Sequence, residues 1–206
     1  MTTLLQIKSS LFSDEGQSSR LADRFVAAWR DANPDGRVIV RDLAREPVPH
    51  LDAARFGAFT ARPEARTAEQ AAVVAYSDAL VDELRRAEVI VLGVPMYNFG
   101  VPSTLKAYFD HVARAGVTFR YTENGPVGLL TGKQAFVFAA RGGRYAGTPR
   151  DTQSGFVRDF LAFLGIDDVE FVYAEGLATG SAVRDQAIAA AHAAIGRLAA
   201  NEAVAA

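Results

Sequence analysis

Residues 89–110 read VIVLGVPMYNFGVPSTLKAYFD and join a predicted strand to a predicted helix. The run Val89–Val94 is apolar almost throughout, which is typical of a parallel strand covered by helices on both faces. A cluster of aromatic, amide and glycine residues follows it, and Leu105, Phe109 and Val112 then recur at helical spacing. This junction predicts an α/β protein with a loop at the carboxyl end of a central strand.

The same alternation of strand and helix extends over the whole chain. The β-prone runs are Leu4–Ile7, Arg37–Val40, Val89–Val94, Ala135–Ala140 and Val169–Tyr173. Helical patterns follow them around Leu21–Trp29, Val73–Leu84, Leu105–Val112 and Phe156–Phe163, and in an alanine-rich stretch from about Val183 to Ala200. Such βα units predict a three-layer α/β sandwich whose parallel strands have the flavodoxin-like order 2-1-3-4-5. A ligand is expected beyond the carboxyl ends of strands one and three.

Two segments depart from this plain pattern. Asp42–Arg66 is a long connection interrupted by prolines, with a short helix expected around Leu51–Phe59. Val117–Leu130 is interpreted as an inserted β-hairpin, although Pro126 does not suit a tight turn.

Composition narrows the possible functions. The 206 residues suit one domain covering residues 1–206, and a net charge of −2 without a basic block argues against nucleic acid or an anionic membrane as partner. The chain has no cysteine, so thiol nucleophiles, disulfides and thiolate metal sites are excluded. His50, His111 and His192 lack metal-ligand spacing, so we expect no metal site. No signal peptide or membrane span is recognised, which favours a cytoplasmic protein.

The loop after the first strand is rich in small hydroxyl residues. Ser10 lies in this loop, and Gln17, Ser18 and Ser19 stand where it leads into the first helix. Backbone N–H groups and the helix dipole attract a phosphate at such a helix start, so these four residues are candidates to surround one. The alternative is that one serine simply caps the helix. Neither a Walker lysine nor a Gly-x-Gly-x-x-Gly fingerprint is present, which disfavours a nucleoside triphosphate or a Rossmann-type dinucleotide.

Two further loops offer surface for a flat ring. Met96, Tyr97 and Phe99 supply apolar area, Asn98 supplies an amide, and Gly100 is expected to allow unusual backbone angles or close approach. After the fourth strand, residues 140–143 read Ala-Arg-Gly-Gly, whose glycines let backbone approach a ligand edge. Alternatively, the aromatic residues belong to the core and the glycines form a flexible loop. Together the three loops predict a mononucleotide site, and a cofactor must supply the chemistry.

The stretch from Pro95 to Pro126 closely resembles the FMN-dependent NADH-azoreductases and quinone reductases. The resemblance rests on PMYNF at residues 95–99, LKxYFD at 105–110 and VARAGVTFRYTENGP at 112–126, and it extends over nearly the whole chain. It implies a flavodoxin-like homodimer that binds one FMN per subunit at the dimer interface.

The resemblance also implies roles for individual residues. Those matching FMN contacts are Ser10, Gln17 and Ser18 for the phosphate, and Met96, Tyr97, Asn98, Phe99, Ala140, Arg141, Gly142 and Gly143 for the ring system. Tyr121 and Phe163 match residues that cover the flavin of the partner subunit. Gly16 and Ala140 stand where the family commonly has serine, so we expect altered FMN affinity rather than loss of binding, since a neutral hydrogen bond contributes only ~1 kcal/mol.

The resemblance implies a two-electron reductase. NADH or NADPH would deliver hydride to the flavin, and a quinone or an azo compound would then take both electrons in the same slot. Arg55, Arg62 and Arg66 are candidates for recognising the 2′-phosphate of NADPH. The main alternative is a non-enzymatic electron carrier of the flavodoxin type, and a nucleotide-sensing regulatory protein is a third.

Overall fold

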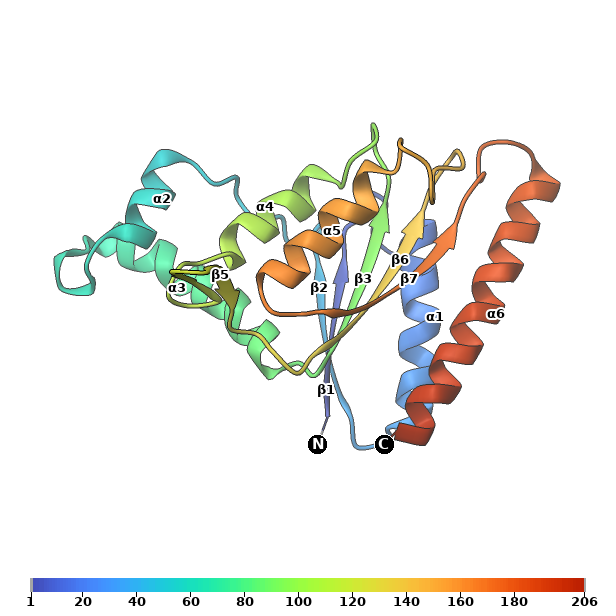
Figure 1. Ribbon diagram of the computed structural model, residues 1–206, viewed down its shortest axis with the longest axis horizontal. Helices are drawn as coiled ribbons and strands as arrows, with labels where there is room; N and C mark the ends of the chain where they lie inside the picture. Colours follow the sequence, from blue (N-terminus) through green and yellow to red (C-terminus); the bar gives the residue numbers. More distant parts are fainter. Residues whose placement is uncertain (1, 206) are drawn as a thin grey trace.

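The central element of the computed structural model, which describes residues 2–205, is a five-stranded parallel sheet (Figure 1). Its order is β2-β1-β3-β6-β7. The strands are β1 (Thr3–Lys8), β2 (Arg37–Asp42), β3 (Val89–Pro95), β6 (Gln134–Ala140) and β7 (Asp168–Ala174). The predicted flavodoxin-like fold is confirmed. The strand numbers differ from 2-1-3-4-5 because the hairpin supplies β4 and β5, which form a sheet of their own.

Helices cover both faces of the sheet. On one face lie α1 (Gln17–Ala32) and α6 (Ser181–Ala205), and on the other lie α3 (Ala68–Arg86), α4 (Ser103–Val112) and α5 (Thr152–Phe163). Neighbouring strand residues point to opposite faces, so Leu4 packs with the first group and Leu5 with the second. Two buried hydrophobic clusters therefore flank one sheet, which explains the nearly continuous apolar runs in the sequence.

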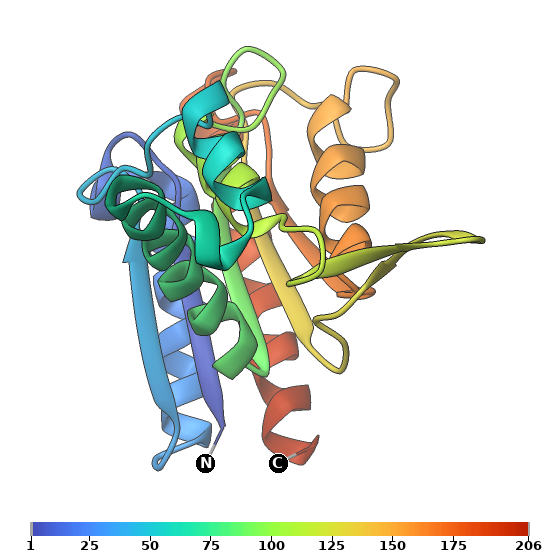
Figure 2. The ribbon, with the colours of Figure 1, turned by 90° about the vertical axis from the view of Figure 1, so that its left-hand side faces the viewer.

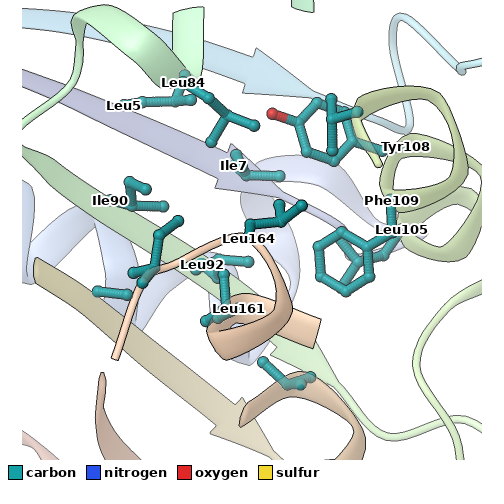
Figure 3. Packing of buried hydrophobic residues seen from close by; sticks show 14 of the residues in the cluster. Leu5, Ile7, Leu84, Ile90, Leu92, Leu105, Tyr108, Phe109, Leu161 and Leu164 are labelled. Atoms are coloured by element: carbon teal, nitrogen blue, oxygen red, sulfur yellow. The ribbon is translucent and has the colours of Figure 1, made fainter. Parts of the chain in front are cut away.

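The core under α3, α4 and α5 is densely aromatic and aliphatic. Figure 3 shows Ile7 and Leu92 of the sheet in the same buried cluster as Tyr108 and Phe109 of α4. Phe109 stacks on Phe160 of α5 with ring centroids 3.9 Å apart. This packing holds α4 and α5 against each other, and these are the two helices that follow the ring-binding loops predicted from the sequence.

The long connection after β2 contains the expected short helix. It is α2 (Ala53–Thr60), and Asp52 caps it by accepting a 2.8 Å hydrogen bond from the Arg55 backbone N–H. A single-turn 3₁₀ helix, η2 (Pro63–Ala65), follows α2 in this connection, and another, η1 (Ser13–Glu15), lies between β1 and α1. In residues 2–205 no helix has the length and apolar character needed to cross a membrane.

The hairpin consists of β4 (Phe119–Thr122) and β5 (Gly125–Gly128). Its strands pair antiparallel, with Tyr121 opposite Pro126. Figure 2 shows it projecting away from the body of the molecule. A backbone hydrogen bond of 2.8 Å from Leu130 N to the Leu164 carbonyl anchors its base to the end of α5.

Candidate functional site

The first helix begins with unpartnered polar groups. Gly16 is the N-cap of α1, and no side chain caps the helix. Ser18 and Ser19 are fully buried, and neither hydroxyl has a hydrogen-bond partner within residues 2–205. The first N–H groups of a helix also lack intrahelical acceptors. Because buried polar groups are normally paired, this cluster suits an anion such as a phosphate, and a capping role for these serines is wrong.

Position 16 has no room for a side chain, because Ser10 packs directly against it. A Cβ atom on Gly16 would lie 2.1 Å from the Ser10 Oγ, although its φ of −66° suits any residue. The Ser10 Oγ accepts a 3.2 Å hydrogen bond from the backbone N–H of Phe12. A serine at position 16 would require Ser10 to move, so the departure from the family pattern fits its surroundings.

The loop after β3 is a tight, strained reverse turn. Tyr97 and Gly100 exchange backbone hydrogen bonds of 3.1 and 3.0 Å across it. Its central residues, Asn98 (φ 50°) and Phe99 (φ 64°), are both left-handed. Such a turn normally carries Asn-Gly, because phenylalanine rarely adopts positive φ. Backbone strain of this kind costs about 1–3 kcal/mol and is typical of binding sites. The unusual backbone angles expected at Gly100 occur instead at its two predecessors, whereas the alternative expectation, close approach to a ligand at Gly100, stays a prediction.

Two adjoining pockets surround this turn. One, of about 270 Å³, is lined by Met96, Asn98, Phe99, Gly142, Gly143 and Tyr145. The other, of about 620 Å³, is lined by Leu11, Met96, Tyr97, Asn98, Pro102 and Ser103. Met96 and Asn98 belong to both. The structure therefore brings together the aromatic-amide loop and the glycine pair that were predicted to meet at the sheet edge.

The Tyr97 hydroxyl connects this turn to the loop after β1. It accepts a 3.3 Å hydrogen bond from the Leu11 backbone N–H and lies 3.5 Å from the Ser10 Oγ. The serine-rich loop and the ring-sized pockets thus form one continuous region at the carboxyl ends of β1, β3 and β6. That is the switch point of the sheet, where the winding direction reverses.

The loop after β6 contributes backbone rather than side chains. Ala140 and Arg141 are buried, whereas Gly142 and Gly143 line the smaller pocket. The Arg141 guanidinium points into the protein, with contacts of 3.0 Å to Glu175 and 2.9 Å to Asp151. Its side chain is therefore enclosed by protein groups.

Tyr121 and Phe163 lie apart from these pockets. Phe119 joins them, with ring centroids 5.4 Å from Tyr121 and 4.2 Å from Phe163. Tyr121 is 73% exposed at the hairpin and borders a separate groove of about 200 Å³ with Phe56 and Phe59 of α2. Within one chain, these two aromatic residues and the Met96–Phe99 turn are separate features.

Several residues at the site escaped the sequence analysis. Tyr145 lies two positions after the glycine pair and contacts Phe99 edge-on at 5.5 Å, so it could have been proposed from its loop. Leu11, Pro102 and Ser103 flank predicted positions. Gln153 has no local signal, because it reaches the turn from the first turn of α5. No group of three or more possible metal-ligating side chains occurs in the described part of the chain.

The fold and the site define an open α/β protein of flavodoxin-like topology with a ligand site at the switch between β1 and β3. The sequence matches the family described as "Flavodoxin-like fold" over residues 2–198, and the chain belongs to that family.

Relatives and solved structures agree with the resemblance seen in the sequence. The FMN-dependent NADH:quinone oxidoreductase of Cellvibrio japonicus is 62% identical over 191 residues, which are 93% of this chain and 95% of the relative. The protein of the same name from Burkholderia pseudomallei is 56% identical over 195 residues, covering 95% and 98%.

The structural neighbours include azoreductases. The azoreductase of Bacillus anthracis superposes with a TM-score of 0.89 at 29% identity, covering 97% of this chain and 99% of that one. An FMN-dependent NADH-azoreductase of the same species, solved in complex with FMN, gives 0.86 at 27% identity, covering 97% and 100%. The sequence-based identification of the family is confirmed.

Proposed function

We propose that this protein is an FMN-dependent oxidoreductase that takes hydride from NADH or NADPH and reduces quinones and azo compounds by two electrons. It acts as a cytoplasmic homodimer, and residues 1–206 form one flavin-binding domain. The observation that carries the proposal is that two pockets meet at Met96 and Asn98, and that the Tyr97 hydroxyl ties the same turn to the loop that leads into α1. At the start of α1, the hydroxyls of Ser18 and Ser19 are buried without a partner in the described residues. The names of the relatives support the same activity.

The residues present fit the parts of FMN. The hydroxyls of Ser10, Ser18 and Ser19, with the first N–H groups of α1, offer donors to a phosphate, and Gln17 stands at the same helix start. The larger pocket, beside Leu11 and Tyr97, adjoins the loop that carries Ser10. A monoanion or dianion at this end needs no lysine, because the helix dipole and several N–H groups stabilise it.

The ring subsite is formed by the strained turn and the glycine pair. Met96 and Phe99 offer apolar contact, and Asn98 offers an amide to the heteroatoms of the ring. Gly142 and Gly143 allow backbone N–H groups to approach the ring edge. Bound FMN supplies the hydride and electron transfer that the side chains cannot perform. The protein supplies stacking surface, orientation and exclusion of water.

The second copy completes the site in this proposal. The Phe119, Tyr121 and Phe163 group is apolar, borders a groove and projects on the hairpin, which suits contact with the flavin of the other subunit. In such a dimer, nicotinamide and acceptor would occupy in turn the slot between the Met96–Phe99 turn and this group. The electron-carrier alternative is not retained, because a nearly neutral chain with an inserted hairpin suits a substrate slot better than a partner-docking surface.

A direct test is stopped-flow mixing of the purified FMN complex with NADH and, separately, with NADPH. Prompt bleaching of the flavin absorbance, followed by recovery on adding a quinone, is the expected result. A protein that takes up no FMN, or whose bound flavin stays oxidised with both nucleotides, would disprove the function. Gel filtration with light scattering measures the oligomeric state on the same preparation.

A further inference from the structure

Gln153 joins the two loops that line the ring-sized pockets. Its Nε2 donates hydrogen bonds of 2.8 Å to the Pro95 carbonyl and 3.1 Å to the Gly100 carbonyl, one on each side of the strained turn. Its Oε1 accepts a 3.3 Å hydrogen bond from the Nε of Arg141, at the start of the glycine loop. The side chain is 1% exposed. One buried amide therefore links the loop after β3 to the loop after β6.

Arg141 extends this link around the glycine loop. Its guanidinium also donates to Ser154 at 2.7 Å and pairs with Asp151 and Glu175. The same Glu175 Oε1 accepts hydrogen bonds of 2.9 Å from the backbone N–H groups of Tyr145 and Ala146. The glycine pair at 142–143 is thus held from both ends by one buried network.

The turn needs such support from outside. Asn98 and Phe99 are in left-handed conformations that their side chains disfavour, and Phe99 is 51% exposed. Strained backbone persists only where surrounding contacts determine it. Gln153 supplies those contacts at Pro95 and Gly100, and the hydroxyl of Thr152 adds a hydrogen bond to the Phe99 carbonyl.

Burial makes the network costly to break. Arg141 is 1% exposed, and a buried guanidinium that loses its partners keeps the full desolvation penalty. Gln153 is the easier position to test, because it carries no charge. Hydrogen bonds of this kind hold side chains and backbone within the narrow range that cofactor binding requires.

We propose that Gln153, together with Arg141, is a positioning residue that sets the separation and tilt of the two ring-binding loops before FMN binds. The inference rests on the proposed function. It assigns to these side chains no contact with the flavin, and it replaces the role that the sequence suggested for Arg141 as a direct ligand. The consequence is a site that is preorganised by α5, so that FMN affinity depends on a residue that the cofactor does not touch.

The experiment compares Gln153→Leu with two other variants on α5. Gln153→Leu keeps the size of the side chain and removes all three hydrogen bonds. Gln153→Glu can still accept from Arg141 but cannot donate to the carbonyls of Pro95 and Gly100. Val157 lies one turn further along α5 and is fully buried in the core. Val157→Ala therefore weakens the same helix without touching either loop. FMN dissociation constants, visible circular dichroism of the bound flavin, and melting temperatures of the FMN-free proteins are measured for all.

The expected result separates positioning from stability. Gln153→Leu should weaken FMN binding by about tenfold or more, since carbonyls and a guanidinium lose buried partners, and it should change the visible dichroism of the flavin. Gln153→Glu should weaken binding too, whereas Val157→Ala should lower the melting temperature with FMN affinity within about twofold of wild type. Wild-type affinity and dichroism in both Gln153 variants would overturn the inference alone. A wild-type protein that binds no FMN would overturn the proposed function and this inference with it.

Discussion

The Cα of Gly93 in β3 faces the backbone of Ser18 at the start of α1. A Cβ atom on Gly93 would lie 3.1 Å from the Ser18 carbonyl oxygen and 3.4 Å from the Ser19 nitrogen. The missing side chain therefore lets the start of the helix lie directly against the central strand. This close approach connects the phosphate end of the proposed site to the ring end, because the same strand continues into Met96.

Gly93→Ala should displace the first turn of α1 by a few tenths of an ångström. We expect a loss of about 1–3 kcal/mol in the free energy of unfolding, as for other overpacked positions. FMN should bind several-fold more weakly, whereas riboflavin, which lacks the phosphate, should be less affected. Flavin fluorescence titrations with both ligands measure the difference. Gly196→Ala is the control, since nothing lies within 4 Å of its Cβ position on α6.

Removing the Ser18 hydroxyl should separate binding from stability. In the FMN-free protein the hydroxyl is buried and has no partner among residues 2–205, so Ser18→Ala should leave the melting temperature unchanged or raise it. FMN affinity should fall by roughly tenfold to 150-fold, which corresponds to about 1.5–3 kcal/mol for one lost hydrogen bond to a charged group.

Ser77 provides the matched control for Ser18. It is equally buried, but its hydroxyl donates to the His111 carbonyl at 2.6 Å and accepts from Arg114 at 2.8 Å. Ser77→Ala should therefore cost about 1–3 kcal/mol of stability without changing FMN affinity. The reverse pattern, with Ser18→Ala destabilising and FMN affinity intact, would contradict the phosphate assignment.

Position 98 tests the strained turn. Asn98→Gly should keep the left-handed backbone and the dimer but lose the amide, which lowers turnover with stability retained. Asn98→Val should lose both turnover and stability, because it also lacks the amide and because a β-branched residue at φ 50° adds about 1–3 kcal/mol of strain. Steady-state rates with NADH and a quinone, measured beside urea unfolding curves, distinguish the two variants. Unchanged rates in Asn98→Val would count against the platform assignment.

His111 gives the protein a pH dependence that can be measured. Its imidazole is buried on α4 between Phe59 and Tyr76, at ring distances of 5.7 Å from each. Burial lowers the pKa of His111, and the nearby Arg55 and Arg114 cations lower it further, against the opposing Pro49 carbonyl and Asp110 carboxylate.

Because this pKa is lower in the folded than in the unfolded state, the unfolded chain binds the proton first as pH falls. Stability should be complete above about pH 6.5 and decline below it, by up to about 1 kcal/mol at pH 5.5 after allowing for solvent screening. Urea unfolding of His111→Leu should show a smaller decline than wild type. A His111→Leu protein with the same pH dependence would assign the effect to other groups, such as His192, whose pKa burial also lowers.

The sequence predicted the strands well because each is encoded locally. Val89–Val94 is apolar on both faces and bounded by charged and turn residues, and the observed strand, Val89–Pro95, differs by one residue. The turn was harder. Gly100 was expected to allow unusual backbone angles or close approach, but the positive φ angles occur at Asn98 and Phe99, in a turn that Gln153 of α5 contacts through the carbonyls of Pro95 and Gly100. Propensity alone could not have indicated this.

Arg141 shows the same limit at the site. The family resemblance implied a contact with the flavin at this position, and nothing nearby in the sequence indicates that the side chain is buried. Its partners Asp151, Gln153 and Glu175 come from the start of α5 and the end of β7. Only the packing of these elements against β6 turns the side chain inward. The meeting of the loops at the sheet edge was predictable from the strand order, whereas the inward direction of the Arg141 side chain was not.

The hairpin depends on an unusually close backbone contact. A Cβ atom on Gly128 of β5 would lie 2.0 Å from the Gly165 nitrogen and 2.1 Å from the Leu164 carbonyl carbon, so no side chain fits there. Gly128→Ala should therefore push the hairpin away from the end of α5. It should also separate Phe119 from Phe163, whose ring centroids lie 4.2 Å apart. We expect a stability loss of about 1–3 kcal/mol.

If the hairpin covers the flavin of the second subunit, Gly128→Ala should also reduce quinone turnover and weaken the dimer more than it weakens FMN binding. Light scattering over a dilution series and steady-state kinetics measure both. Val127→Ala is the control, because Val127 is 42% exposed on the same strand and its truncation leaves the backbone contact intact. A Gly128→Ala protein with wild-type dimerisation and turnover, despite its lower melting temperature, would restrict the hairpin to a structural role.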